Sequence, residues 1–472
     1  MAGETVAVVG LGANNQPLVP YLSRRGYRLV VADRKPPDAV QATLATLEGH
    51  EAVEAVYAGP DYLERLSERT DLAAVYLTPG MVKTQPPILK LKAGGTRITC
   101  ETDLVLASCP LPVVGITGSA GKSTTTTLVG LALKASGVPT WMGGNLGRSL
   151  LWDWEAMAAS GHGVAVLELS SFQLELVEHS PWGAVFLNLT PNHLDVHESF
   201  EAYGMAKSRI LAYQGRRDWA VLPARDPVVE QYAGVGQGRR YRVDLEGPVE
   251  AGMWSDGEWL WWQPAGQAAQ PVVAVSAIRL IGRHNLANVA YAAAAALLAG
   301  GRREAVAQVA REFGGLPHRL ETVATVKGVT FINDSIATTP ERTAAALGAV
   351  TAPAILIAGG YDKHLDYTPL AEAVAKSTVR AVVLIGATRE KIATVLDPLG
   401  VQVFRAESLE GAAALAAAEA RAGEVVLLSP ASASYDMFRD FQERGERFRR
   451  WVQDYKARVG EGRGADGLGG TP

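Results

Sequence analysis

Short runs of consecutive apolar residues recur along the chain, and stretches of mixed polarity separate them. Near the start, apolar runs at 6–9 and 27–32 flank a glycine-containing turn at 10–15 and a helical pattern at 16–26. A strand, a helix and a second strand in this order form a βαβ unit. Two further apolar runs continue the alternation, at 72–77 and 97–99. The pattern therefore predicts a small doubly wound, Rossmann-like domain.

Two more series of strands follow. The first of these two series starts with an apolar run at 113–116. Its other expected elements are strands at 164–167, 184–189 and 219–222, a β-rich segment at 239–273 and an alanine-rich helix at 287–298. After a turn-rich segment at 313–319, the third series has strands at 329–332, 354–358, 381–384 and 425–428 and an alanine-rich helix at 410–422.

A chain of 472 residues is too long for one ordinary core, since domains usually contain roughly 100 to 200 residues. We therefore predict an α/β protein with three domains. The predicted parts are a Rossmann-like domain at 1–110, a central nucleotide-binding domain with a mixed sheet at 111–314, a Rossmann-like C-terminal domain at 315–460 and a flexible tail at 461–472.

Composition narrows the class of protein. Hydrophobic residues make up 48% of the chain, and 45 basic residues stand against 49 acidic ones, for a formal charge of −4. This balance gives no electrostatic reason to expect a nucleic acid or a membrane as partner. The chain has two cysteines, no signal-peptide pattern and no apolar run of about 18 residues. We expect a cytoplasmic globular protein that acts on small molecules.

The strongest motif lies at 115–123, which reads Gly-Ile-Thr-Gly-Ser-Ala-Gly-Lys-Ser between an apolar run and a helical pattern. This is the phosphate-loop pattern, in which backbone N–H groups and a helix N-terminus converge on phosphate oxygens. Lys122 is expected to bridge the β- and γ-phosphates of ATP, and Ser123 to hold Mg²⁺. The residues expected to bind ATP here are Gly118, Ser119, Ala120, Gly121, Lys122, Ser123 and Thr124.

A further ligand for the same Mg²⁺ is expected at the end of a neighbouring strand, where four apolar residues precede Glu168. The alternative interpretation makes Glu168 a surface turn before a helix that Ser170 and Gln173 cap.

Several strings together resemble the Mur ligases. They are Gly-Ser-Ala-Gly-Lys-Ser-Thr from 118, Gly-Gly-Asn-Leu-Gly from 143, Leu-Glu-Leu-Ser-Ser-Phe-Gln-Leu-Glu from 167 and Asn-Leu-Thr-Pro-Asn-His-Leu-Asp from 188. The third string is most similar to the branch that adds D-glutamate, and the resemblance extends from residue 10 to about 448. It implies an ATP- and Mg²⁺-dependent ligase that joins D-glutamate to UDP-N-acetylmuramoyl-L-alanine in peptidoglycan precursor synthesis, acting as a monomer.

The resemblance also implies a second Mg²⁺ ion. His193 is expected to bind it, and Lys207 is expected to react with CO₂ and become a carbamate ligand. His193 and His197, four residues apart, also fit a two-histidine zinc site, although no third ligand is evident. An ordinary helix-surface lysine is the alternative for Lys207, and a surface histidine is the expectation for His197. The residues expected to be catalytic are Lys122, Glu168, His193, Lys207 and Arg319; those expected to bind metal are Ser123, Glu168, His193 and Lys207.

By the same resemblance, further residues contact nucleotide and substrates. Asn285 and Asn288, which alternatively only cap a helix, are expected to bind ATP together with Arg319 on phosphate and Asp334 on ribose. The expected UDP-sugar contacts are Leu11, Ala13, Asn14, Asp33, Arg34, Gly80 and Asn145, and the expected D-glutamate contacts are Thr338, Lys363, Ser434 and Phe441. The loop at 10–15 with Asp33 also resembles a dinucleotide fingerprint, but Asn15 replaces its third glycine, which disfavours a dehydrogenase.

One position departs from the family pattern. Ile336 stands where the best-known members have a lysine, so Lys363 and Arg342 would have to bind the acceptor carboxylates instead. Two alternatives follow from this departure. One is a Mur-type ligase with another amino-acid acceptor, and the other is a catalytically idle paralogue that binds the UDP-sugar or a partner protein.

Overall fold

The structure is a computed structural model that describes residues 3–191, 197–280, 282–363 and 365–465, with only the backbone of 460–465. Contacts divide the chain into two compact units, Met1–Phe313 and Gly314–Pro472, and each is described by itself. The first unit contains a five-stranded and a nine-stranded sheet, and the second contains a six-stranded sheet. The α/β class predicted from the sequence is confirmed. None of the helices within the described ranges has the length and apolar character needed to cross a membrane.

The first sheet has the strand order β3-β2-β1-β4-β5, and all its pairings are parallel. Its β1 is buried at every position, as expected for a parallel sheet with both faces covered. The strands are β1 (Thr5–Val9), β2 (Arg28–Asp33), β3 (Val53–Ala58), β4 (Leu72–Leu77) and β5 (Arg97–Thr99), and the helices are α1 (Leu18–Ser23), α2 (Pro37–Leu44), η1 (His50–Ala52), α3 (Tyr62–Leu66), α4 (Pro86–Ala93) and α5 (Glu101–Ser108).

The helix predicted at 16–26 is shorter in the structure, because α1 begins only at Leu18. Turns occupy the preceding residues, and the buried Asn15 side chain holds them by donating a hydrogen bond to Val9 O at 3.0 Å.

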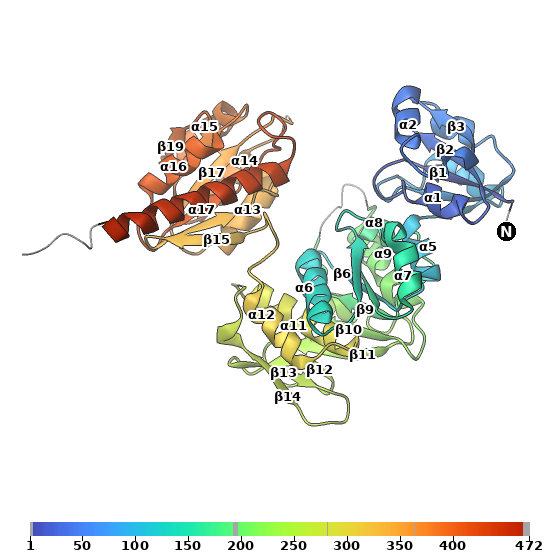
Figure 1. The fold of residues 1–472 in the computed structure, drawn as a ribbon, viewed down its shortest axis with the longest axis horizontal. Coiled ribbons are helices and arrows are strands. Elements are labelled where there is room, and N and C mark those ends of the chain that lie inside the picture. The colour runs from blue at the N-terminus through green and yellow to red at the C-terminus, as the bar shows by residue number, and fades with distance from the viewer. Residues whose placement is uncertain (1–2, 192–196, 281, 364, 466–472) are drawn as a thin grey trace, which may run out of the picture. The chain divides into compact units, whose positions relative to one another are not determined.

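The second sheet has the order β14-β13-β12-β11-β10-β9-β6-β8-β7 and is mixed, because β12, β13 and β14 pair antiparallel. Helices cover both of its faces (Figure 1). Apolar residues of α6, α11 and α12 form one core with the strands, and those of α7, α8 and α9 form another. The strands are β6 (Val113–Thr117), β7 (Thr140–Gly144), β8 (Val164–Glu168), β9 (Gly183–Phe186), β10 (Trp219–Pro223), β11 (Arg239–Asp244), β12 (Gly252–Ser255), β13 (Trp259–Gln263) and β14 (Gln270–Ala274). The helices are α6 (Lys122–Ala135), η2 (Leu150–Asp153), α7 (Trp154–Ser160), α8 (Ser171–Leu174), α9 (Phe200–Ala212), α10 (Pro227–Glu230), η3 (Val275–Ala277), α11 (Arg283–Leu298) and α12 (Arg303–Glu312).

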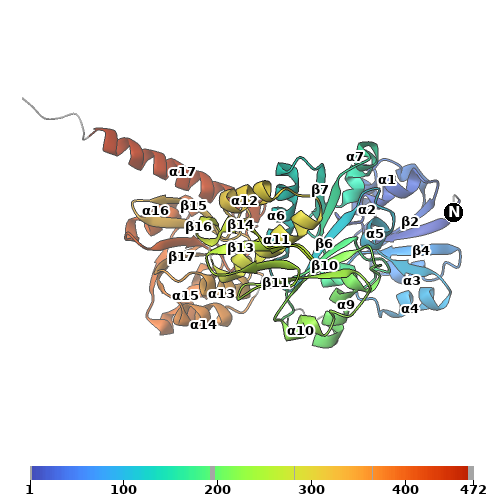
Figure 2. The ribbon, with the colours of Figure 1, turned by 90° about the horizontal axis from the view of Figure 1, so that it is seen from below.

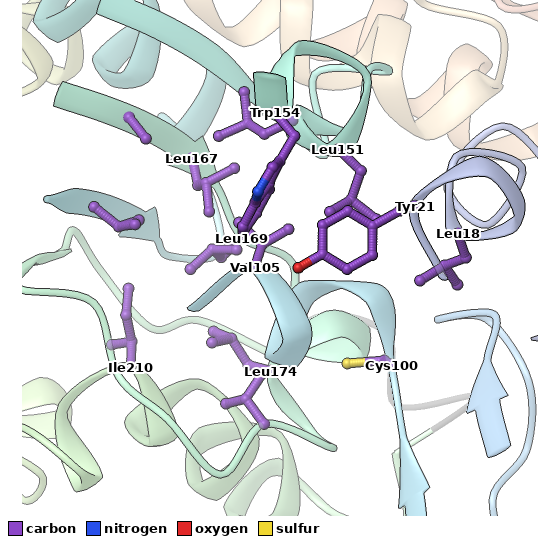
Figure 3. Packing of buried hydrophobic residues seen from close by; sticks show 14 of the residues in the cluster. Leu18, Tyr21, Cys100, Val105, Leu151, Trp154, Leu167, Leu169, Leu174 and Ile210 are labelled. Atoms are coloured by element: carbon purple, nitrogen blue, oxygen red, sulfur yellow. The ribbon is translucent and has the colours of Figure 1, made fainter. Parts of the chain in front are cut away.

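One apolar cluster joins the elements of the first sheet to those of the second (Figure 3). Tyr21 of α1 meets Trp154 of α7 edge to face, with ring centroids 4.9 Å apart. Val105 of α5 and Leu151 of η2 belong to the same cluster. The first sheet is therefore packed onto the part of the chain that carries the phosphate loop.

The sheet of the second unit has the order β15-β16-β20-β17-β18-β19, parallel except for β15. Apolar residues of α13, α14 and α15 cover one face, and those of α16 and α17 cover the other (Figure 2). The strands are β15 (Glu321–Val326), β16 (Val329–Asn333), β17 (Ala354–Gly359), β18 (Val379–Ile385), β19 (Gln402–Arg405) and β20 (Val425–Leu428), and the helices are α13 (Pro340–Ala349), α14 (Thr368–Lys376), α15 (Arg389–Leu396), η4 (Asp397–Leu399), α16 (Leu409–Glu419) and α17 (Phe441–Ala465).

Candidate active site

The phosphate loop connects β6 to α6 and requires glycine at two positions. Gly118 has a φ of 151° and Gly121 a φ of 86°, a region that residues with a Cβ rarely adopt. Space is limiting as well. A Cβ on Gly118 would lie 2.9 Å from Leu187 Cβ, and one on Gly121 would lie 2.2 Å from Asn288 Oδ1. The backbone of the loop is thus packed closely against its neighbours.

Asn188, which follows β9, holds the loop from the adjacent strand. Ser119 N donates to Asn188 O at 3.0 Å, and Ala120 N donates to Asn188 Oδ1 at 2.9 Å. The Asn188 amide donates back to Ala120 O at 3.1 Å. Sequence reasoning gave Asn188 no role, although its position at a strand end beside the phosphate loop was the available signal.

Lys122 is the first residue of α6. Its Nζ donates to Gly118 O at 2.9 Å and to Ser119 O at 3.2 Å, so the ammonium lies over the loop. Ser123 and Thr124 follow in the first turn, where backbone N–H groups and the helix dipole favour an anion. The predicted phosphate-binding residues are therefore brought together at one helix N-terminus.

Glu168 ends β8, beside β6, and only 2% of its surface is exposed. Its Oε1 accepts a hydrogen bond from Asn145 Nδ2 at 2.7 Å. Its buried Oε2 has no hydrogen-bond partner among the residues placed in the structure. A buried carboxylate oxygen without a donor suits a cation ligand, because such an atom is costly unless something pairs with it.

The alternative interpretation of Glu168 as a surface turn is wrong, because the hydrophobic β8 strand carries it into the interior. The capping box that accompanied this interpretation is nevertheless present: Ser170 Oγ accepts from Gln173 N at 3.3 Å, and Gln173 Oε1 accepts from Ser170 N at 3.0 Å.

Lys207 lies on α9 and is 1% exposed, so the alternative of a helix-surface lysine is wrong. Its Nζ donates to Gly118 O at 3.0 Å and lies 3.4 Å from Thr117 Oγ1. Burial, reinforced by the Lys122 ammonium, lowers its pKa well below the usual value, and Glu168 opposes part of this effect. The structure therefore places two lysine amines on the carbonyl of Gly118.

An aromatic residue links α9 to the phosphate loop. The Tyr203 ring centroid lies 4.8 Å from Lys207 Nζ, and its hydroxyl lies 3.1 Å from Ser119 Oγ. The expectation that His197 is a surface histidine is wrong. His197 is buried beside Tyr203, and its Nε2 lies 3.0 Å from Ser171 Oγ. Tyr203 was missed in the sequence, because nothing local distinguishes it from a core aromatic.

His193 and Asp195 lie outside the described residues. Among the residues placed in the structure, no cluster of three or more histidine, cysteine, aspartate or glutamate side chains has the geometry of a metal site. Because His193 lies outside the described residues, the two-histidine interpretation is not tested by the structure.

One of the two predicted asparagines of α11 lies against the phosphate loop. Asn288 is buried against Gly121 and donates to Asn285 Oδ1 at 3.2 Å. Gly282 occupies the N-cap position of α11, so neither asparagine is the N-cap.

The predicted UDP-sugar loop follows β1. Asp33, at the end of β2, accepts hydrogen bonds from Leu11 N at 2.6 Å and Lys35 N at 2.9 Å. One oxygen of this buried carboxylate thus fixes the loop after β1, and the other fixes the turn after β2. The Leu11 side chain is buried too. The remaining predicted contacts in this region, Ala13, Asn14, Arg34, Gly80 and Asn145, are exposed or partly exposed.

In the second unit, Asp334 follows β16 and is buried. Ser429 Oγ donates to its Oδ2 at 2.8 Å, and Leu320 N donates to its Oδ1 at 3.1 Å. Burial raises the pKa of Asp334 to about 6. The residues on either side of Arg319 have positive φ, 63° at His318 and 42° at Leu320, so Arg319 lies on a strained turn attached to Asp334.

Three of the predicted D-glutamate residues lie on loops after β16, β17 and β20, which are adjacent strands of this sheet, and the fourth, Phe441, is the first residue of α17. Ser434 is buried, whereas Lys363 is exposed with its Nζ 5.7 Å from the Tyr435 ring centroid. Thr338 N donates to Ile336 O at 2.9 Å. Phe441 O accepts from Ser335 Oγ at 2.8 Å.

A buried arginine that sequence reasoning missed connects these loops. Arg444 donates from Nε to Ser335 Oγ at 3.0 Å, from Nη2 to Ser335 O at 2.9 Å, and from Nη1 to Ser432 O at 3.1 Å and Ala433 O at 3.2 Å. Burial lowers its pKa to about 10. In sequence it stands within a charged helix, which predicts a solvent-facing residue instead.

Comparison with known proteins identifies the family. Residues 116–296 match the family described as Mur ligase middle domain, and residues 318–432 match that described as Mur ligase, glutamate ligase domain. The chain is 42% identical over 456 residues to the UDP-N-acetylmuramoylalanine--D-glutamate ligase of Symbiobacterium thermophilum, covering 95% of this chain and 98% of that one. It is 38% identical to the same enzyme of Acetivibrio thermocellus, covering 96% and 97%.

Solved structures share the fold at lower identity. The UDP-N-acetylmuramate-alanine ligase MurC of Thermotoga maritima has a TM-score of 0.54 at 17% identity, covering 96% of this chain and 100% of that one. A pseudomurein peptide ligase type C of Methanothermus fervidus has a TM-score of 0.53 at 15% identity, covering 96% and 100%. The resemblance noted in the sequence is confirmed, and this chain belongs to the Mur ligase family.

Proposed function

We propose that this chain joins D-glutamate to UDP-N-acetylmuramoyl-L-alanine at the expense of ATP, as a step of peptidoglycan precursor synthesis. Relatives named for this reaction are 36–42% identical over about 95% of the chain. The observation that carries the proposal is the arrangement around the phosphate loop, where Lys122 and Lys207 both contact Gly118 O and Glu168 ends the adjacent strand. We place the reaction in the cytoplasm and expect a monomer, as the resemblance implies.

Mur ligases use ATP and Mg²⁺, and the donor set fits the metal. Ser123 and Glu168 would hold one ion, and His193 with a carbamylated Lys207 would hold the second. The unpartnered buried Oε2 of Glu168 supports this assignment. When bound, Mg²⁺ supplies positive charge to the phosphate oxygens and to the developing negative charge of the transferring group.

The protein's own groups then act by position and charge. The loop fixed by Asp33 would hold the UDP-sugar, so that an oxygen of the L-alanyl carboxylate attacks the γ-phosphorus and ADP leaves. The product is an acyl phosphate. Lys122 and Arg319 would neutralise charge on the phosphoryl oxygens. The amine of D-glutamate then attacks the acyl carbon, phosphate leaves, and the amine gives up a proton as the amide forms.

The proposed carbamate of Lys207 would require a neutral amine, which attacks the carbon of CO₂, forms an N–C bond and releases one proton. Burial in contact with a second lysine favours the uncharged amine. The carbamate would carry a negative charge close to the Lys122 ammonium and could serve as a metal ligand. In Lys207→Ala we expect turnover to fall by at least about a hundredfold and acetate to restore part of it, because acetate can occupy the vacated ligand position.

Lys134→Ala is the matched control, since Lys134 is exposed near the C-terminal end of α6. Labelled bicarbonate should give a carbamate carbon signal in wild type and not in Lys207→Ala. Full activity of Lys207→Ala without acetate would disprove the carbamate role.

The function itself is tested by phosphate release from ATP with Mg²⁺ and UDP-N-acetylmuramoyl-L-alanine. D-glutamate is compared with other amino acids as acceptor. Lys122→Ala should abolish acyl-phosphate formation. Release dependent on D-glutamate supports the proposal. Release with another amino acid identifies a ligase of different specificity, the alternative that Ile336 favours, and no release with any acceptor favours an idle paralogue.

A further inference from the structure

A buried carboxyl group outside the proposed chemistry lies where the first sheet meets the second. Glu101 is the first residue of α5, the helix that leads from β5 to β6, and 6% of its surface is exposed. Its Oε1 accepts from Ser149 Oγ, and its Oε2 accepts from Thr102 Oγ1 at 3.2 Å. Both of these partners are neutral hydroxyl groups. Such a group is costly to bury, and burial raises its pKa to about 7.

Ser149 closes the loop that follows β7. Its hydroxyl donates to Glu101 and also accepts from Leu151 N at 3.1 Å, so Ser149 is the N-cap of η2. Leu151 belongs to the apolar cluster that contains Val105 of α5 (Figure 3). One end of the loop is thereby fixed to the helix that carries Glu101.

The other end of this loop is fixed to Glu168. Asn145 N donates to Glu168 O at 2.9 Å, and its side-chain amide donates to Oε1. Gly144 has a φ of 81°, and a Cβ there would lie 2.3 Å from Glu168 O. Gly144 N donates across the loop to Arg148 O at 2.9 Å. Between these two attachments, residues 145–148 are exposed.

We infer that Glu101 is a positioning residue for the ligase reaction: by holding Ser149, it fixes the loop at 144–149 and keeps the Asn145 amide on the carboxylate of Glu168. The inference rests on the proposed function, because Glu168 is a metal ligand only there. It explains why an acid is retained in an apolar junction with hydroxyl partners. A hydrogen bond to a carboxylate stabilises the loop end more than one to a neutral acceptor.

The chain offers a matched pair of variants. Ser149→Ala and Thr102→Val each remove one hydroxyl donor from Glu101, and both residues are buried. Only Ser149 belongs to the loop. At a pH well above the Glu101 pKa of about 7, where the carboxylate form prevails, we expect kcat/KM for the UDP-sugar to fall roughly tenfold in Ser149→Ala, the effect of one hydrogen bond to a charged group, and by less than about twofold in Thr102→Val. Glu101→Gln keeps a neutral acceptor for Ser149 Oγ and should lose less than Ser149→Ala, and the double variant should lose no more than Ser149→Ala alone.

A second measurement does not depend on catalysis. Hydrogen exchange of the Gly144 and Asn145 amides, whose acceptors are Arg148 O and Glu168 O, should become faster in Ser149→Ala and stay unchanged in Thr102→Val. In an Asn145→Ala background, Ser149→Ala should have no further effect on kcat/KM.

Equal losses of kcat/KM in Ser149→Ala and Thr102→Val, or unchanged exchange in Ser149→Ala, would overturn the inference and leave Glu101 a structural residue. A failure of the proposed function is seen separately, as a wild-type protein that releases no phosphate with any acceptor. In that case the exchange measurement still decides whether Glu101 fixes the loop.

Discussion

The substitution Gly121→Ala tests whether the phosphate loop works through its contact with Asn288. Gly121 precedes α6 with a φ of 86°, and Gly137 follows the same helix with a φ of 83°. A Cβ on Gly121 would lie 2.2 Å from Asn288 Oδ1, whereas a Cβ on Gly137 has no atom within 4 Å. Gly137→Ala therefore has the backbone strain alone, and Gly121→Ala has the strain and the collision.

The magnitudes follow from these two contributions. A left-handed conformation costs an alanine about 1–2 kcal/mol, so the free energy of unfolding should fall by this amount in both variants. Only Gly121→Ala forces Asn288 away, which also breaks its 3.2 Å hydrogen bond to Asn285 and costs about 1 kcal/mol more. The displaced amide is one of the predicted nucleotide contacts. We therefore expect the Kd for ATP to rise at least about tenfold in Gly121→Ala and to stay within twofold of wild type in Gly137→Ala.

Calorimetric titration with a non-hydrolysable ATP analogue and Mg²⁺ measures the two affinities, and thermal unfolding measures the shared strain. If Gly121→Ala and Gly137→Ala bound the analogue equally well, Asn288 would not contact the nucleotide, and the argument from its position would fail. An unchanged stability of Gly137→Ala would show instead that the strain is smaller than assumed.

Three further predictions concern other parts of the chain. Burial raises the Glu101 pKa from 4.5 to about 7, so between these two pH values the folded state keeps a proton that the unfolded state releases. The unfolding free energy of wild type should therefore fall as pH rises through this window, by up to about 3 kcal/mol relative to Glu101→Gln. Urea unfolding that gave the two proteins the same pH dependence of this free energy would contradict the prediction. Asp33→Ala leaves the buried Leu11 amide without its acceptor, so we expect a loss of about 2 kcal/mol in unfolding free energy and a higher KM for the UDP-sugar, measured by melting and kinetics. Arg342→Ala should raise the KM for D-glutamate roughly tenfold and leave the KM for ATP unchanged, because Arg342 lies beside Ile336. Equal changes in both constants would show that Arg342 does not bind the acceptor.

What the sequence predicted correctly is mostly local. The phosphate loop is read from a contiguous motif, and its glycines and lysine come together because a buried strand and a helix follow one another. The apolar runs likewise predicted the central strands of all three sheets, since both faces of those parallel strands are covered. Four strands at sheet edges, β3, β7, β15 and β19, were not predicted, because they are only partly buried and lack a continuous apolar run. At β9 the predicted strand was too long at its end, because Leu187 and Asn188 leave the sheet to hold the phosphate loop.

The burial of single polar residues was not predictable in the same way. Lys207 is buried because α9 packs against β6 and the phosphate loop. His197 is buried between α8 and α9, where it stacks on Phe172 and lies beside Tyr203. Arg444 stands in a helix rich in charged residues, yet its guanidinium donates to the carbonyl groups of Ser432, in the preceding loop, and of Ser335, 109 residues away. Such burial is decided by contacts more than fifty residues away in sequence, or by loops that only tertiary structure brings near.

The Arg444 contacts also bear on the unusual Ile336. The backbone on either side of this residue is fixed independently of its side chain: Arg444 holds Ser335, and Thr338 N donates to Ile336 O. Replacing a lysine by isoleucine at this position therefore alters the charge of the loop and not its path. The Arg444 guanidinium is buried under this loop, whereas Arg342 is exposed and donates to the Ile336 carbonyl at 3.3 Å, and Lys363 is exposed beside Tyr435. A carboxylate of the acceptor is thus expected to meet a guanidinium that approaches from α13, so the specificity for D-glutamate would depend on Arg342.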